Sequence, residues 1–201
     1  MRCGAYPGSF NPPTTAHLAV AEAARRQYGL DRVDLIVSRV ALGKEGVAHP
    51  RFADRLSVLG AMVASRPWLG LAVVESQLLA DVAQGYDIVV MGADKWGQVI
   101  DPAWYGGSES ARDEAVARLP RVVVVPRPPY PLPAPGSTGV EVLDLPTYHG
   151  DVSSTAARGG SREWMAPEAA AFDERTGAWT DLDRYRAWVG GGGATAGGLA
   201  R

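Results

Sequence analysis

Short apolar runs that alternate with helix-like segments constrain the fold of this chain more than any other feature. The runs are rich in Val, Ile and Leu, as is typical of strands buried on both faces. They cover residues 2–6, 33–37, 69–74, 87–91, 121–125 and 140–145. The clearest helical stripe between them consists of Phe52, Leu56, Leu59, Met62 and Val63. This alternation predicts a parallel α/β sheet with right-handed crossovers and ligands bound beyond the carboxyl ends of its strands.

The composition is that of one globular domain. With 201 residues, 46% hydrophobic and 21% charged, the chain can bury a sizeable core, and we assign residues 1–189 to a single domain. Residues 126–139 contain six prolines and are expected to form an extended loop. Residues 190–201, rich in Gly and Ala, are expected to be a disordered tail.

Charge and cysteine content exclude several classes of protein. A formal net charge of -2 provides no overall attraction to nucleic acid or membranes, so phosphate affinity must come from local groups. Cys3 is the only cysteine, which excludes an internal disulfide and is typical of a cytoplasmic protein. The sequence contains neither a signal-peptide pattern nor an apolar run of the roughly 20 residues that cross a bilayer.

The segment 6–18 has the properties of an anion site. A strand end is followed by Gly8, which permits a tight turn, and by Pro12–Pro13, which are accepted at a helix start. We expect a helix to begin here, capped near Asn11 or Thr14. Its free amides and positive dipole end favour a phosphate, and Thr14 and His17 share the adjoining helix face.

Two motifs resemble the nucleotidyltransferase superfamily. Gly8-Ser9-Phe10-Asn11-Pro12 with Thr14-x-x-His17 is similar to G-x-F-D/N-P-x-H/T-x-x-H, and residues 152–158, VSSTAAR, are similar to I-S-S-T-x-x-R. The resemblance implies a Rossmann-like, doubly wound sheet with helices on both faces. It also implies ATP and phosphate contacts by Gly8, Ser9, Phe10, Thr14, His17, Ser153, Ser154 and Arg158, with His17 and Arg158 catalytic. For Thr14, a purely capping role is an equal alternative.

Further segments resemble the nicotinamide and nicotinate mononucleotide adenylyltransferases. Gly92-Ala93-Asp94 is similar to their Gly-Ala-Asp segment, which implies nucleotide binding by Gly92 and Asp94, although Asp94 could instead cap a helix. Trp104 resembles the tryptophan that stacks on the pyridine ring, with packing as the alternative. Arg127 resembles an arginine that closes the next strand. Lys44 lies where the superfamily often places a catalytic, acceptor-binding lysine, or is a solvated loop residue.

The resemblance implies an adenylyltransferase. It would move AMP from ATP, with Mg2+, to the phosphate of a pyridine mononucleotide and release pyrophosphate for NAD biosynthesis. Residues 6–10 and the short connection at 73–83 resemble phosphopantetheine adenylyltransferase instead. Cytidylyl transfer and a nucleotide-binding sensor without catalysis are further alternatives. No side chains suggest a resident metal site. The sequence leaves open whether the protein forms a homo-oligomer. Residues 159–164 depart from the helix-forming pattern of both families.

Overall fold

A single parallel sheet forms the centre of the protein. The computed structural model describes residues 1–39, 49–76, 78–134, 139–146 and 152–192. Its six strands are parallel and lie in the order β3-β2-β1-β4-β5-β6. They are β1 (Cys3–Pro7), β2 (Arg32–Ser38), β3 (Leu69–Val74), β4 (Ile88–Gly92), β5 (Arg121–Val125) and β6 (Val140–Val142). The predicted Rossmann-like fold is confirmed. The last strand ends before the predicted residue 145.

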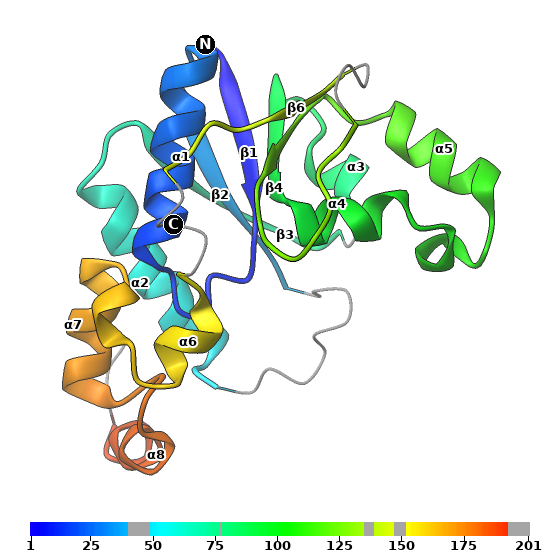
Figure 1. The fold of residues 1–201 in the computed structure, drawn as a ribbon. Coiled ribbons are helices and arrows are strands. Elements are labelled where there is room, and N and C mark those ends of the chain that lie inside the picture. Colours follow the sequence, from blue (N-terminus) through cyan, green and yellow to red (C-terminus); the bar gives the residue numbers. More distant parts are fainter. Residues whose placement is uncertain (40–48, 77, 135–138, 147–151, 193–201) are drawn as a thin grey trace.

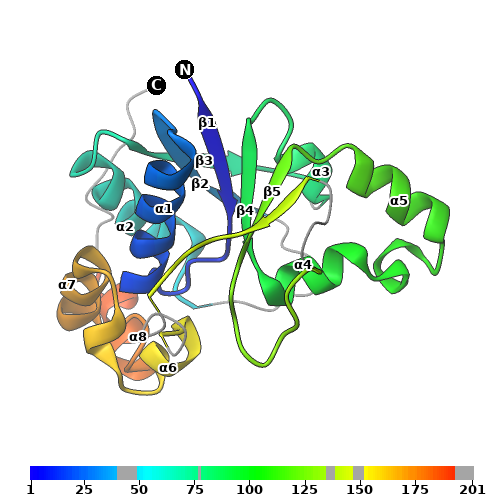
Figure 2. The same ribbon diagram turned by 45° about the horizontal axis from the view of Figure 1, so that its top comes forward.

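Helices cover both faces of this sheet (Figures 1 and 2). The helices are α1 (Thr15–Tyr28), α2 (Phe52–Ala64), α3 (Leu79–Val82), α4 (Ala93–Ile100), α5 (Glu109–Ala117), α6 (Ser154–Arg158), α7 (Pro167–Thr176) and α8 (Leu182–Gly190). Two 3-10 turns, η1 (Pro102–Tyr105) and η3 (Arg162–Trp164), complete the described elements. Figure 1 shows α1 and α2 with α6, α7 and α8 on one side, and α3, α4 and α5 on the other.

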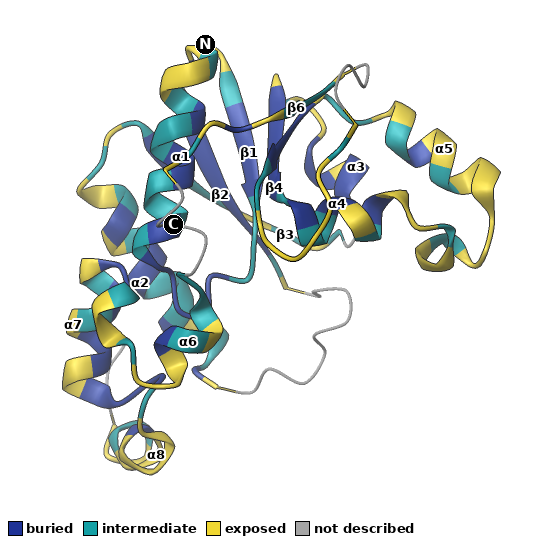
Figure 3. Ribbon diagram, in the orientation of Figure 1, coloured by how far each residue is buried: buried dark blue, intermediate teal, exposed yellow. Residues whose placement is uncertain are grey.

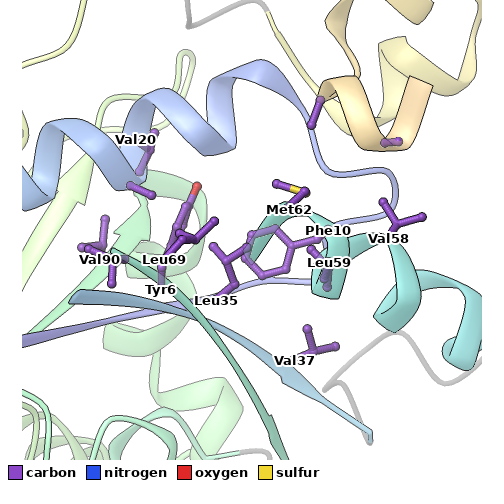
Figure 4. Close-up of a cluster of buried hydrophobic side chains, with 14 of the residues drawn as sticks. Tyr6, Phe10, Val20, Leu35, Val37, Val58, Leu59, Met62, Leu69 and Val90 are labelled. Atoms are coloured by element: carbon purple, nitrogen blue, oxygen red, sulfur yellow. The ribbon is translucent and has the colours of Figure 1, made fainter. Parts of the chain in front are cut away.

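Alternating strand residues divide the core into two layers. Tyr6 of β1 and Leu35 of β2 pack toward α1 and α2, whereas Ala5 and Ile36, their neighbours in sequence, pack toward α3 and α4. Helices cover both layers, and Figure 3 shows the central strands almost entirely buried. The first layer extends through the apolar stripe of α2, as the close-up in Figure 4 shows. The prediction of strands buried on both faces is thus confirmed for the central strands, whereas the edge strands β3 and β6 leave Val73 and Val142 exposed.

The structure corrects one local expectation and decides a second that the sequence left open. The helix after the first strand begins at Thr15, so Pro12–Pro13 precede its N-cap instead of occupying its first turn. Residues beyond Arg158 do form helices, η3, α7 and α8, although residues 159–164 lack a helix-forming pattern. Pro167 starts α7, as proline at N1 favours. Within the predicted proline-rich loop, the described residues 126–134 contain neither helix nor strand.

The topology reverses between β1 and β4. These strands are neighbours and parallel, yet the chain leaves β1 toward α1 on one face and leaves β4 toward α4 on the other. In doubly wound sheets, ligands bind in the crevice that such a reversal opens beyond the carboxyl ends of the strands. The segment 8–14 and the start of α4 flank this point.

Candidate nucleotide site

The turn after β1 is built around a buried phenylalanine. Phe10 has a φ of 43° and is almost fully buried, with its ring edge-on to Tyr6 at 5.6 Å and to His17 at 5.0 Å. A Cβ at Gly8 would lie 2.8 Å from the tip of the Phe10 ring. Glycine is therefore needed at position 8 for the ring beneath it. Phe10 shapes the turn from the core, so only its backbone is left for the predicted phosphate contact.

Thr14 and His17 form a reciprocal cap at the start of α1. The Thr14 hydroxyl accepts from the backbone N–H of His17 at 3.3 Å, and His17 Nδ1 accepts from the backbone N–H of Thr14 at 2.9 Å. A backbone amide can only donate, so Nδ1 carries no proton and the neutral imidazole holds its proton on Nε2. Thr14 is fully buried, which favours its capping role. His17 is half-buried.

The second motif lies directly against the first. Ser153 caps α6 by accepting from the N–H of Ala156 at 3.1 Å. The Ser154 hydroxyl donates to the carbonyl of Pro12 at 2.7 Å, and the Arg158 guanidinium donates to the carbonyl of Asn11. Two segments that lie about 140 residues apart in the chain thus meet beyond the end of β1, with Arg158 exposed at their edge.

Across the reversal, Asp94 and Arg127 follow the ends of β4 and β5. Gly92 is the N-cap of α4, so Asp94 lies in the first turn and the alternative of a capping aspartate is wrong. Arg127 Nη1 lies 3.9 Å from Asp94 Oδ2, and both side chains are partly exposed. Burial raises the pKa of Tyr6, and the charges of Arg127 and Asp94 act on the same phenol. These three residues therefore share one electrostatic neighbourhood between β1, β4 and β5.

One predicted acceptor residue, Trp104, is not brought to this neighbourhood. Trp104 lies on η1 with 44% of its surface exposed. In both ribbon views, this segment between α4 and α5 is well away from the start of α1 (Figures 1 and 2). Lys44 lies outside the described residues, so its predicted role is not addressed by the structure.

Sequence reasoning missed Arg55 and Trp179. Arg55, a residue of α2, donates from Nη1 to the Ser9 carbonyl at 3.1 Å, and burial lowers the pKa of Arg55. Its signal was an arginine three residues after Phe52, on the apolar stripe of α2. Trp179 donates from Nε1 to Asn11 Oδ1 at 2.6 Å. No local pattern identified that contact.

Among the described residues, no group of three or more His, Cys, Asp or Glu side chains could hold a metal ion. Within the same part of the chain, no helix is both long and apolar enough to cross a membrane.

A family model described as cytidylyltransferase-like matches residues 5–160, which include both motifs and the β1–β4 reversal. The chain belongs to the cytidylyltransferase-like family. This cytidylyltransferase-like protein is accordingly a nucleotidyltransferase enzyme, as its two motifs predict.

Relatives of this cytidylyltransferase-like protein share one name. A probable nicotinate-nucleotide adenylyltransferase of Solibacter usitatus is 27% identical over 192 residues, 86% of this chain and 96% of the relative. Another protein of that name, from Methylorubrum extorquens (strain PA1), is 30% identical over 71% of this chain and 79% of its own. The fold resembles the Plasmodium falciparum nicotinic acid mononucleotide adenylyltransferase complexed with APC. That match has a TM-score of 0.63 and 12% identity, and covers 89% and 96% of the two chains.

Proposed function

We propose that this nucleotidyltransferase moves AMP from ATP to the phosphate of nicotinate mononucleotide and releases pyrophosphate, a step of NAD biosynthesis. The observation that carries the proposal is the meeting of the two motifs, in which Ser154 and Arg158 hold the carbonyl oxygens of Pro12 and Asn11. The acceptor rests on the two relatives, which share one name and match 86% and 71% of this chain.

In this reaction an oxygen of the acceptor phosphate attacks the α-phosphorus of ATP in line, and the bond to pyrophosphate breaks. Negative charge grows on the non-bridging oxygens and on the leaving group, so positioned donors are the main catalytic means. His17 Nε2–H and the turn amide at Ser9 donate to the triphosphate. Gly8 contributes the tight turn beside the phosphates, because its own N–H already donates to the Ile36 carbonyl at 3.0 Å. Arg158 has five N–H donors, of which the contacts to Asn11 and Thr155 use two. Mg2+ enters with ATP as part of the substrate.

The acceptor occupies the other side of the reversal. Asp94 and Gly92 lie beside the nucleotide sugars. Arg127 neutralises the acceptor phosphate, because its ion pair with Asp94 is weak: the two atoms are 3.9 Å apart and both side chains are partly exposed. Lys44 stays a proposed acceptor contact. Trp104 stays one only as a hypothesis to be tested, because it lies on η1, away from Asp94 and Arg127. Its setting is the cytoplasm, which the single cysteine supports.

An acceptor panel tests the proposal. The full chain is supplied with MgATP and, in separate reactions, nicotinate mononucleotide, nicotinamide mononucleotide or phosphopantetheine. Pyrophosphate release and the adenylylated product are measured. We expect the highest kcat/KM with nicotinate mononucleotide. A higher value with phosphopantetheine, or ATP binding without pyrophosphate release from any acceptor, would overturn the proposal.

A Trp104→Ala variant tests the acceptor side, with Trp68→Ala as a control at the opposite end of the sheet. We expect the first to raise the KM for the mononucleotide severalfold while the KM for ATP stays constant. An unchanged acceptor KM removes Trp104 from the site.

A further inference from the structure

The side chain of Asn11 is held from the C-terminal part of the chain. Trp179 Nε1 donates to Asn11 Oδ1 at 2.6 Å, across 168 positions of sequence. An indole N–H can only donate, so the amide oxygen of Asn11 must face it and the orientation of the amide is determined. Asn11 is nearly buried and directly follows Phe10, the residue with positive φ.

Trp179 is itself rigidly placed. Its backbone N–H donates to Asp173 Oδ1 at 2.7 Å, and its ring lies edge-on to Phe172 at 5.9 Å. Asp173 is fully buried and also accepts from the Thr180 hydroxyl at 2.7 Å and from Arg162 Nε at 2.9 Å. A buried carboxylate satisfied by this many donors is a firm anchor for the residues around it.

We propose that Trp179 is a positioning residue for the phosphate-binding turn. Through Asn11 it holds the segment between β1 and the cap at Thr14, and therefore the direction in which His17 faces. If the turn can shift by about an ångström, its donors are misaligned with the transition state. Turnover then falls more than the affinity for the bound substrate. This inference rests on the proposed function only in its kinetic tests, because kcat can be measured only for an active enzyme. Residue 179 lies beyond the 5–160 range of the family match.

Trp179→Phe tests the proposal, with Trp188→Phe as its matched control. Both rings pack on Phe172, at 5.9 and 5.6 Å, and both variants lose an indole. Among the described contacts, only the Trp179 indole donates to the turn. We expect kcat to fall about tenfold in the first variant with little change in the KM for ATP, and to stay within about twofold in the second. Equal kcat values in two folded variants overturn the proposal.

Asn11→Leu provides a second route that leaves Trp179 in place. It removes the acceptor but keeps the carbonyl that Arg158 binds. We expect a similar loss of kcat, and no further loss when Trp179→Phe is added, because both changes break the same contact. Independent, multiplying losses would contradict the proposal, as would a normal kcat in Asn11→Leu.

A readout without catalysis separates this inference from the proposed function. In a 1H–15N spectrum, the Trp179 indole signal, assigned by its loss in Trp179→Phe, should move on addition of ATP and in Asn11→Leu, while the Trp188 indole signal stays. If the enzyme is inactive with every acceptor but the Trp179 signal responds in this way, the proposed function is contradicted and the inference about Trp179 stands. A Trp179 signal that is unmoved in Asn11→Leu overturns the inference.

Discussion

Thr14 and His17 form a capping box in which histidine takes the position more often held by Glu or Gln. The imidazole therefore serves the helix through Nδ1, and in the proposed mechanism serves the triphosphate through Nε2. The motif identified the residue, and the structure adds the bond that sets its tautomer. The two contributions can be measured separately.

His17→Ala is expected to lower kcat by about a hundredfold to a thousandfold, because a transition-state donor is lost. It should also lower the free energy of unfolding by about 1 kcal/mol, because Thr14 loses its acceptor. His17→Glu restores an acceptor for the Thr14 N–H but cannot donate as a carboxylate, so it should recover stability without turnover. Steady-state kinetics and thermal unfolding of both variants provide the measurements, and a fully active Glu variant would contradict the mechanism.

Gly8 shows how a correct residue can have an unexpected reason. Its sequence position indicated a backbone that approaches a ligand, whereas the structure places the Phe10 ring where a Cβ would lie. Both explanations require glycine, and a sequence cannot distinguish them because the Phe10 ring and a ligand would exclude the same Cβ atom. Only the folded turn identifies the neighbour.

Among the elements, α8 docks on the start of α2 through one buried hydroxyl. Tyr185 donates to the fully buried carboxylate of Asp54 and accepts from the backbone N–H of Arg51 at 2.8 Å. Arg51 Nε also binds Asp54 at 2.7 Å. Helical periodicity predicted α2, but this partner is 131 positions away.

Tyr185→Phe is expected to lower the free energy of unfolding by about 1–3 kcal/mol, because buried groups lose their partner. Thermal unfolding measures this, with the half-exposed Tyr130→Phe as the control. Burial, followed by the bond to Asp54, raises the pKa of Tyr185 above its ordinary 10.0. The difference between wild type and variant is therefore present below pH 10.0 and shrinks as the pH rises through the raised pKa. A difference that grows above pH 10.0 would contradict this assignment.

For the whole molecule, we propose that residues 1–189 form one cooperative unit. Met165, Phe172, Trp179 and Tyr185 share a core layer with Phe10 and the stripe of α2. Because burial of each large side chain contributes about 1.5–3 kcal/mol, the C-terminal helices are expected to unfold together with the sheet on which they pack.

A chain that ends at Gly160, close to the limit of the family match, is therefore expected to lose its cooperative thermal transition. A chain that ends at Gly192 should keep it. Near-ultraviolet circular dichroism during heating distinguishes them. A cooperative transition in the shorter chain would show that residues 161–192 are a separate unit.

The alternating strands and helices, the Rossmann-like class and the two motifs could be predicted, since they depend on periodicity and on residues close together in the chain. The contacts that hold the motifs became visible only in the folded chain: Arg158 binds Asn11, Arg55 binds Ser9 and Trp179 binds Asn11. Such contacts join residues far apart in sequence, and one hydrogen bond between them imposes no spacing that a single sequence can reveal. The physical reason is that local order is encoded by repetition, whereas a long-range contact depends on the whole core that brings its partners together.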